Sequence, residues 1–210
     1  MPQQAKLYKI LGANGEATNG GTGKWFLPHG NRPGRWMPKI KGELIPCENG
    51  YHLCRRRDLV HWLGPTIWEA EYRGECVAAE DKVVVWQARL IRHVETWNNG
   101  TARLFACDCA EYALGFVKNP DPRSVEAVRV VRLFAIGEAT NEELAAARDA
   151  AWAAAWAAAG DAAWAAAGDA AWAAARDAAW AAAWDAAWAA ARAWMTKRLF
   201  QYLDGEVGHD

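Results

Sequence analysis

The amino-acid sequence predicts an α+β protein: a small mixed-sheet head with two short helices, followed by a long α-helical arm rich in alanine and tryptophan. Three observations support this fold class. Short apolar runs bounded by turn-forming residues recur up to about residue 94. Helix-capping residues and apolar stripes of helical period follow. Beyond residue 148, alanine, the best helix former, takes most positions.

The predicted strands alternate with loops rich in glycine, proline and asparagine. The strongest are Leu7 to Leu11, a short apolar run closed by Gly12, and Lys82 to Val94, which contains three consecutive valines. Residues 12–41 are expected to form long loops with one or two short strands. The further strands are Glu43 to Pro46, Tyr51 to Cys54 and Thr66 to Tyr72, and Arg55 to Leu63 is expected to be a short helix.

Three later helices are predicted from their caps. In the first, Asn98, Asn99 and Thr101 offer caps ahead of residues 103–116, which place Phe105, Cys109, Tyr112 and Phe116 on one apolar stripe. Asp121-Pro122 begins a second helix that runs to about Ile136 and ends at Gly137, since aspartate is a good cap and proline suits the first helical turn. Residues 140–143, with the sequence TNEE, form a capping box that begins a third.

The arm carries a four-residue repeat. From Arg148 to Arg192 every fourth residue is something other than alanine. A step of four advances about 400° around a helix, so the bulky residues form a spiralling ridge that we expect to mediate self-association. One continuous helix is the first interpretation, and a break near Gly160 and Gly168 is the second. Expansion of a short coding repeat, with no task for the ridge, is the alternative to an interface. The predicted interface residues are Trp152, Trp156, Trp164, Trp172, Trp180, Trp184 and Trp188.

These patterns divide the chain into a head (1–116), a connecting helix and turn (117–140), the arm (141–203) and a flexible tail (204–210). Residues 1–140 carry 19 Lys/Arg and 15 Asp/Glu, and residues 141–210 carry 5 and 10. A net charge of +4 on the first part falls short of a dedicated nucleic-acid binder. We find no signal-peptide pattern and no uncharged run of membrane-spanning length. With five cysteines, an odd number, reduced thiols in the cytosol are expected.

Few residues suggest chemistry. Cys47, His52 and Cys54 form the densest group of metal-ligand types, but their spacing differs from zinc knuckles. We therefore expect buried thiols, a packed histidine and no metal. In the loop and strand nearby, Trp25, Arg35, Trp36 and Tyr51 are candidate ligand-binding residues. The alternative for this loop is that its aromatic residues fill the core and its cations are solvated.

Two resemblances extend these predictions. Residues 7–115 resemble an uncharacterised domain family of phages and actinobacteria, through Tyr8-Lys9, the motif PCENGYHLC at residues 46–54, and Ala88 to Leu90. Residues 101–155 resemble the alanine-rich helical family of immunity proteins from polymorphic toxin systems, through TARLFACDCAEYALGF and the segment that follows it. That family implies a cytosolic, toxin-binding helical module. Here the Trp/Ala repeat replaces its later histidine-containing helices.

A fold-level analogy to ADP-ribosyltransferases places Tyr8 and His52 as candidate catalytic residues near a nicotinamide. The function expected first is a non-enzymatic interaction protein of a phage or bacterial cytosol, the host cytosol if the protein is phage-encoded. Its head would bind a protein partner or small ligand, its arm would self-associate, and an immunity- or anti-defence-like role would suit it. It would need no cofactor. The alternative is an enzyme that uses NAD, which requires a concave pocket between the first strand and the strand of Tyr51 and His52.

Overall fold

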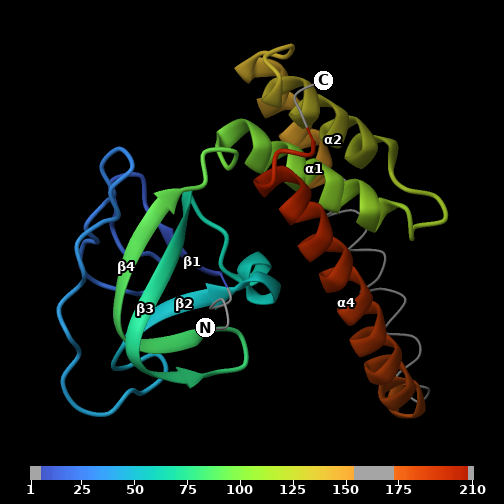
Figure 1. Cartoon of the computed structure of the whole chain (residues 1–210). Helices are drawn as coiled ribbons and strands as arrows, with labels where there is room; N and C mark the ends of the chain where they lie inside the picture. Colours follow the sequence, from blue (N-terminus) through green and yellow to red (C-terminus); the bar gives the residue numbers. More distant parts are fainter. Residues whose placement is uncertain (1–5, 154–172, 208–210) are drawn as a thin grey trace. The chain divides into compact units, whose positions relative to one another are not determined.

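A computed structural model describes residues 6–153 and 173–207, with the backbone alone over 173–187 (Figure 1). The chain is α+β, as predicted, and divides into two compact units. Unit 1 comprises Met1–Asn98 and Thr196–Glu206, and unit 2 comprises Asn99–Met195 and Val207–Asp210. The boundary therefore lies at residue 98, where the sequence predicted 116. The predicted tail also begins inside unit 1, because residues 204–206 belong to it.

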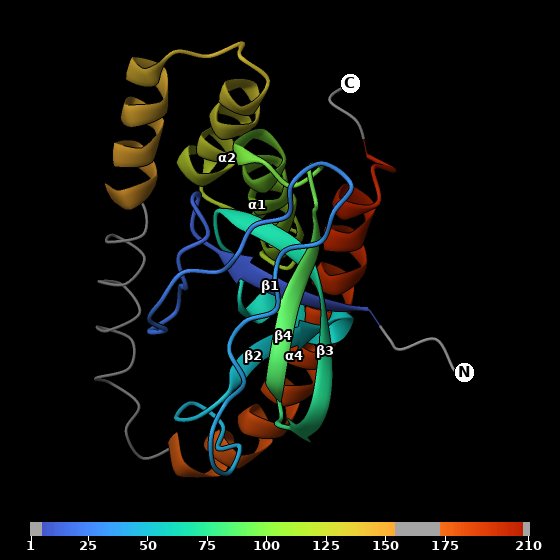
Figure 2. The ribbon, with the colours of Figure 1, turned by 60° about the vertical axis from the view of Figure 1, so that its left-hand side comes forward.

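Unit 1 is a closed barrel of four strands: β1 (Leu7–Leu11), β2 (Tyr51–Arg55), β3 (Thr66–Ala78) and β4 (Val83–His93). The spatial order is β1-β2-β4-β3, and β1 pairs with β3 to close the ring (Figures 1 and 2). Every one of these pairs is antiparallel, so the predicted mixed sheet is wrong. The reason lies in the connections: β3 turns directly into β4, whereas a parallel pair needs a long crossover, usually through an α-helix.

Two irregularities bend the long β3–β4 hairpin. The register shifts between Glu69 and Ala70 and again between Arg73 and Cys76. At the second shift Gly74 has a φ of +83°, and a Cβ atom there would lie 2.9 Å from the Trp86 ring. Only glycine combines this left-handed backbone with so close a neighbour. Such bulges bend a strand and increase its twist, which lets a sheet of four strands close.

A long loop completes the barrel wall. The backbone N–H groups of Gly34, Met37 and Ile40 donate to carbonyl oxygens of β4 at 2.9, 2.9 and 3.0 Å. These β4 carbonyls follow the stretch of β4 that pairs with β2, so the loop hydrogen-bonds to β4 beyond the end of its pairing with β2. The strand predicted at Glu43 to Pro46 does not form. Ile45 instead makes an isolated bridge with Asn49 across a tight turn.

The end of the chain packs within unit 1. Helix α4 (Ala173–Leu203) finishes with a buried group made of Leu199, Phe200, Tyr202 and Leu203. The Phe200 ring lies edge-on to Tyr8 of β1, with 5.7 Å between centroids. The Thr96 hydroxyl donates to the Leu203 carbonyl at 2.7 Å. This apolar group covers one side of β1, whereas its other side faces the core cluster of Leu7, Leu11, Trp25, Leu53, Val85 and Leu90.

Unit 2 is helical. It contains α1 (Asn99–Leu114), α2 (Pro122–Ala135) and a helix over residues 141–153. Both predicted caps form: Asp121 accepts from the Arg123 N–H at 2.8 Å, and Thr140 and Glu143 bond reciprocally. Arg132 of α2 bridges Asp108 and Glu111 of α1 at 2.9 and 2.8 Å. In the described part of the chain, no helix has the length and apolarity needed to cross a membrane.

The arm is described only at its ends. The residues outside the described ranges include Gly160, Gly168, Trp156, Trp164 and Trp172. The choice between one continuous helix and a break near the two glycines therefore stays a prediction. Trp180 and Trp184 fall in the stretch described by its backbone alone. Near the end of the arm, Trp194 stacks on Tyr112 of α1 with centroids 4.2 Å apart.

The packing of the chain end on β1 leads to a stability prediction. The Phe200 side chain is only 1% exposed. The substitution Phe200→Ala should therefore lower the free energy of unfolding of unit 1 by about 3–5 kcal/mol. Phe116 is 74% exposed, so Phe116→Ala is the matched control and should change it by less than about 0.5 kcal/mol. Urea titrations read by hydrogen exchange of the β3 and β4 amides measure both. Equal effects of the two substitutions would show that the chain end does not stabilise the barrel.

Candidate functional site

The candidate site is a cavity of about 280 Å³ in unit 1. Its walls come from β1 (Lys9, Ile10), β2 (His52, Cys54) and the turn at residues 18–21. Cys47, Trp62 and Lys82 complete the lining. The volume lies just below the roughly 300–1,000 Å³ of typical small-molecule pockets. The cavity therefore suits a ligand smaller than a dinucleotide.

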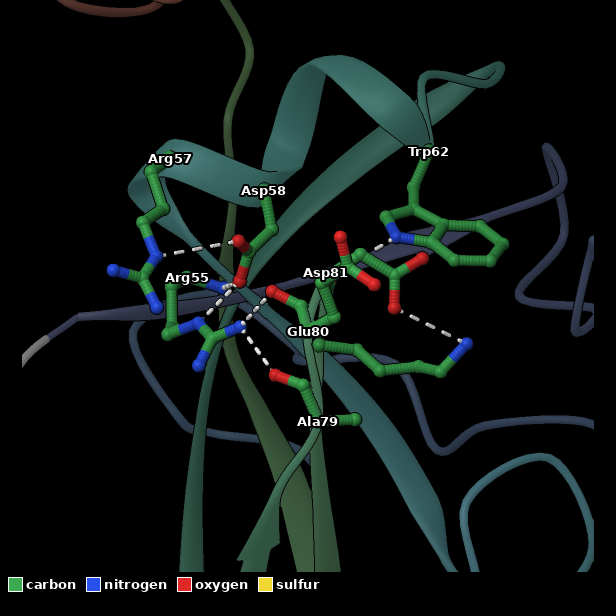
Figure 3. Close-up of polar contacts among 8 residues, drawn as sticks. Arg55, Arg57, Asp58, Trp62, Ala79, Glu80 and Asp81 are labelled. Carbon is green, nitrogen blue, oxygen red and sulfur yellow. Dashed lines mark hydrogen bonds and ion pairs between the residues drawn. The ribbon is translucent and has the colours of Figure 1, made fainter.

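One wall is positioned by an arginine clamp (Figure 3). The short 3-10 helix η1 (Arg56–His61) follows β2, and Arg55 at its start forms an ion pair with the buried Asp58. The same guanidinium donates to the carbonyl oxygens of Ala79 and Glu80 at 2.7 and 2.8 Å. These carbonyls belong to the turn between β3 and β4, so the clamp ties η1 to that turn.

The clamp places two lining residues. Trp62 follows η1, and its indole N–H donates to the Asp81 carbonyl at 3.0 Å. Lys82 follows Asp81, and its ammonium lies 4.6 Å from the centroid of the Trp62 ring. The ammonium also pairs with the Asp81 carboxylate at 3.4 Å. A cation over an indole face is favourable, so Trp62 and Lys82 hold each other at the cavity.

The opposite wall is a tight turn. Asn19 and Gly20 both have positive φ values, 57° and 80°, and the Gly21 N–H donates to the Thr18 carbonyl at 3.2 Å. Two successive positive φ values define a type I′ turn, for which Asn-Gly is the favoured pair. The Thr18 hydroxyl donates to the Ile10 carbonyl at 3.4 Å, which fastens the turn to β1.

His52 is a neutral hydrogen-bond acceptor. The backbone N–H of Cys47 donates to its Nε2 at 2.9 Å, so this nitrogen carries no proton. Burial, and next the charges of Lys9 and Lys82, lower the pKa of His52. Both effects favour the neutral imidazole at pH 7. Cys47 itself has a φ of 70°, uncommon for a residue with a side chain.

Lys9 is the second cation of the cavity. Its ammonium donates to the His52 carbonyl at 3.2 Å and lies 5.2 Å from the centroid of the Trp25 ring. Burial lowers its pKa. Among the described residues, no carboxylate lies within ion-pair distance of it. Lys9 is thus a partly buried lysine without an acidic partner.

The structure does not bring the two candidate catalytic residues together. Tyr8 is buried against Phe200 and lines no part of the cavity, whereas His52 does. A concave pocket between β1 and β2 is present, as the NAD-using alternative requires. Because it lacks Tyr8 and is small, it gives that alternative no support.

The four candidate ligand-binding residues also lie outside the cavity lining. The Tyr51 hydroxyl donates to the Pro38 carbonyl at 2.8 Å, and its ring packs edge-on to the buried Trp25. The Arg35 guanidinium lies 4.1 Å from the Phe26 ring centroid. Trp36 has two arginine neighbours, Arg73 and Arg89, at 4.4 and 4.6 Å. These contacts agree with the interpretation in which the loop aromatics pack within the unit.

The three weak metal candidates do meet, since Cys47, His52 and Cys54 all line the cavity. Within the described residues, however, no three side chains of ligand type are arranged to hold a metal ion. Burial raises the pKa of Cys54 to about 12, which keeps it a thiol, whereas metals bind the thiolate. Sequence reasoning missed Lys9 and Lys82. For Lys9 a signal existed: it is the one charged residue in the apolar run LYKIL.

The neutral state of His52 predicts a pH dependence. Its pKa is lower in the folded than in the unfolded state, so below about pH 6.5 the unfolded chain binds more protons. Stability should therefore fall as pH drops through about 6.5 toward the folded-state pKa, by at most about 1.4 kcal/mol per pH unit. His52→Gln should flatten this part of the profile, and His29→Gln, at an exposed histidine, is the control. Urea titrations between about pH 5 and 8 measure it. An unchanged profile in His52→Gln would contradict this account.

Searches of family models, curated proteins and solved structures return no match to this chain. The resemblances to the phage and actinobacterial domain family and to the immunity proteins therefore stay predictions.

Proposed function

We propose that this chain is a non-enzymatic binding protein of the cytosol. In this proposal the barrel holds a small ligand, or a small group of a protein partner, in the cavity of Lys9, His52 and Lys82. The α-helical arm, rich in alanine and tryptophan, brings chains together. Such a combination would suit an immunity- or anti-defence-like role.

The cavity is the observation that carries the proposal. Its walls are held by side chains with other partners: Arg55 clamps the turn before Lys82, and the Thr18 hydroxyl fastens the glycine turn. Preformed walls favour binding because little freedom is lost when a ligand enters. The titratable groups also favour binding over catalysis. His52 Nε2 is occupied by a backbone N–H, and Cys54 is a protonated thiol.

The exposed tryptophans support the role of the arm. Trp152 is 68% exposed and Trp188 is 53% exposed. A tryptophan can bury about 150–250 Å² in an interface. Alanine on neighbouring turns allows a second helix to approach closely, and little side-chain entropy opposes the contact. The occupant we propose is the arm of a second copy of this chain.

Binding in the cavity can be tested by a fragment screen on the full-length, ¹⁵N-labelled protein. We expect some fragments to shift the amide resonances of Gly20, Gly21 and His52 together, because all three residues line the cavity. Gly20→Trp should suppress the shifts of the Gly21 and His52 amides, since the open space beside residue 20 would be filled. Gly30→Trp is the control, because Gly30 also has a positive φ and open space but lies outside the cavity lining. Shifts that never include these amides would refute a binding role for the cavity.

Self-association can be tested by sedimentation. The mass of the wild-type chain should rise with concentration, and the double variant Trp152→Glu/Trp188→Glu should weaken association by about tenfold or more. Phe116→Glu is the matched control, because Phe116 is an aromatic residue at least as exposed as the two tryptophans but lies outside the arm. A monomer at every concentration, or an equal loss in Phe116→Glu, would contradict a role for the arm.

A further inference from the structure

We infer that the ligand of the cavity carries an oxyanion, a phosphate or carboxylate group, bound between Lys9 and Lys82. This inference rests on the proposal that the cavity binds a ligand, and it names the chemical class of that ligand.

The charges that line the cavity are of one sign. Lys9 and Lys82 both contribute to the lining, and none of the lining residues is an aspartate or glutamate. Asp81 stands beside the cavity and pairs with Lys82 at 3.4 Å, so it offsets one of the two positive charges. Asp58, the other nearby carboxylate, is engaged by Arg55 and Arg57. The charge of Lys9 remains unbalanced.

Lys9 indicates where the anion sits. A lysine ammonium has three N–H donors, and within the described chain Lys9 uses one, on the His52 carbonyl. A charge withdrawn from water without a counter-ion destabilises the folded state. A ligand oxyanion would supply both the missing charge and acceptors for the free donors.

The remaining walls describe the rest of the ligand. Gly20 has no atom within 4 Å of the position of a Cβ, so a ligand can approach the turn closely. The Trp62 ring and Ile10 supply apolar surface. With about 280 Å³ available, the cavity suits a small metabolite that joins one anionic group to a short apolar or ring portion.

Three probes that share one phenyl ring separate the effect of charge from that of the ring: phenyl phosphate, benzoate and benzyl alcohol. We expect at least one of the two anions to shift the amides of Gly20, Gly21 and His52 saturably, and benzyl alcohol to bind about tenfold more weakly or not at all. Lys9→Met and Lys82→Met should each lower the affinity for the anion by about tenfold or more. Lys41→Met is the control, because Lys41 is an exposed lysine of the same unit outside the cavity. The anion that binds with the higher affinity shows whether the oxyanion of the ligand is a phosphate or a carboxylate.

The stability of Lys9→Met without ligand distinguishes a lysine that binds a ligand from a lysine that stabilises the fold. Lys9→Met should fold with an unchanged or raised unfolding midpoint, because it removes an unpaired charge. A lowered midpoint together with unchanged anion affinity would overturn the inference. So would benzyl alcohol binding as tightly as the anions at the same amides, although the cavity would remain a binding site. If no probe or fragment shifts these amides, the inference and the proposed function both fail.

Discussion

The ion pair between Arg55 and Asp58 is the interaction on which the candidate site depends. Asp58 is buried in η1, and the Arg55 guanidinium joins it to the carbonyls of Ala79 and Glu80 (Figure 3). One planar group with several fixed donors thereby connects the end of β2 to the turn between β3 and β4. Removing Asp58 would leave the Arg55 guanidinium without its carboxylate, and removing Arg55 would leave the buried Asp58 with Arg57 as its remaining ion-pair partner. Trp62 and Lys82 lie on the two segments that this clamp joins, so the clamp helps to hold this wall of the cavity.

The barrel needs segments from both ends of the chain. Its four strands lie before residue 94, but the apolar cover of Tyr8 comes from Phe200 and its neighbours. The helical unit is therefore inserted between Asn98 and Thr196, and the chain must leave unit 1 and return to it. A consequence follows for the arm. Its self-association cannot be separated from the barrel by simple truncation, because a cut after residue 140 would also remove the chain end that covers β1.

His52 connects several segments around the cavity. Its imidazole Nε2 and its backbone carbonyl both act as acceptors, one for the Cys47 backbone N–H and one for the Lys9 ammonium. The histidine thus connects β1, β2 and the loop before β2. The packed histidine expected from the sequence agrees with these two hydrogen bonds, whereas the catalytic role of the alternative is untested.

The sequence by itself determined where most of the described strands and helices lie, although the strand expected at Glu43 to Pro46 does not form. Apolar runs, Asp121-Pro122 and the Thr140 capping box predicted strands and helix starts, because these signals act through neighbours a few residues away. Tertiary structure alone decided the antiparallel closure of the barrel, the return of Phe200 to β1 and the meeting of Lys9 with Lys82. Lys9 lies on β1 and Lys82 beside the turn between β3 and β4. The apolar run LYKIL makes Lys9 unusual, but nothing in the sequence pairs it with Lys82. Both line one cavity in the closed barrel, in which two register shifts bend the β3–β4 pair and the Arg55 guanidinium holds the turn before Lys82. Bends and clamps of this kind depend on side chains that are distant in the chain, so no local pattern of residues encodes them.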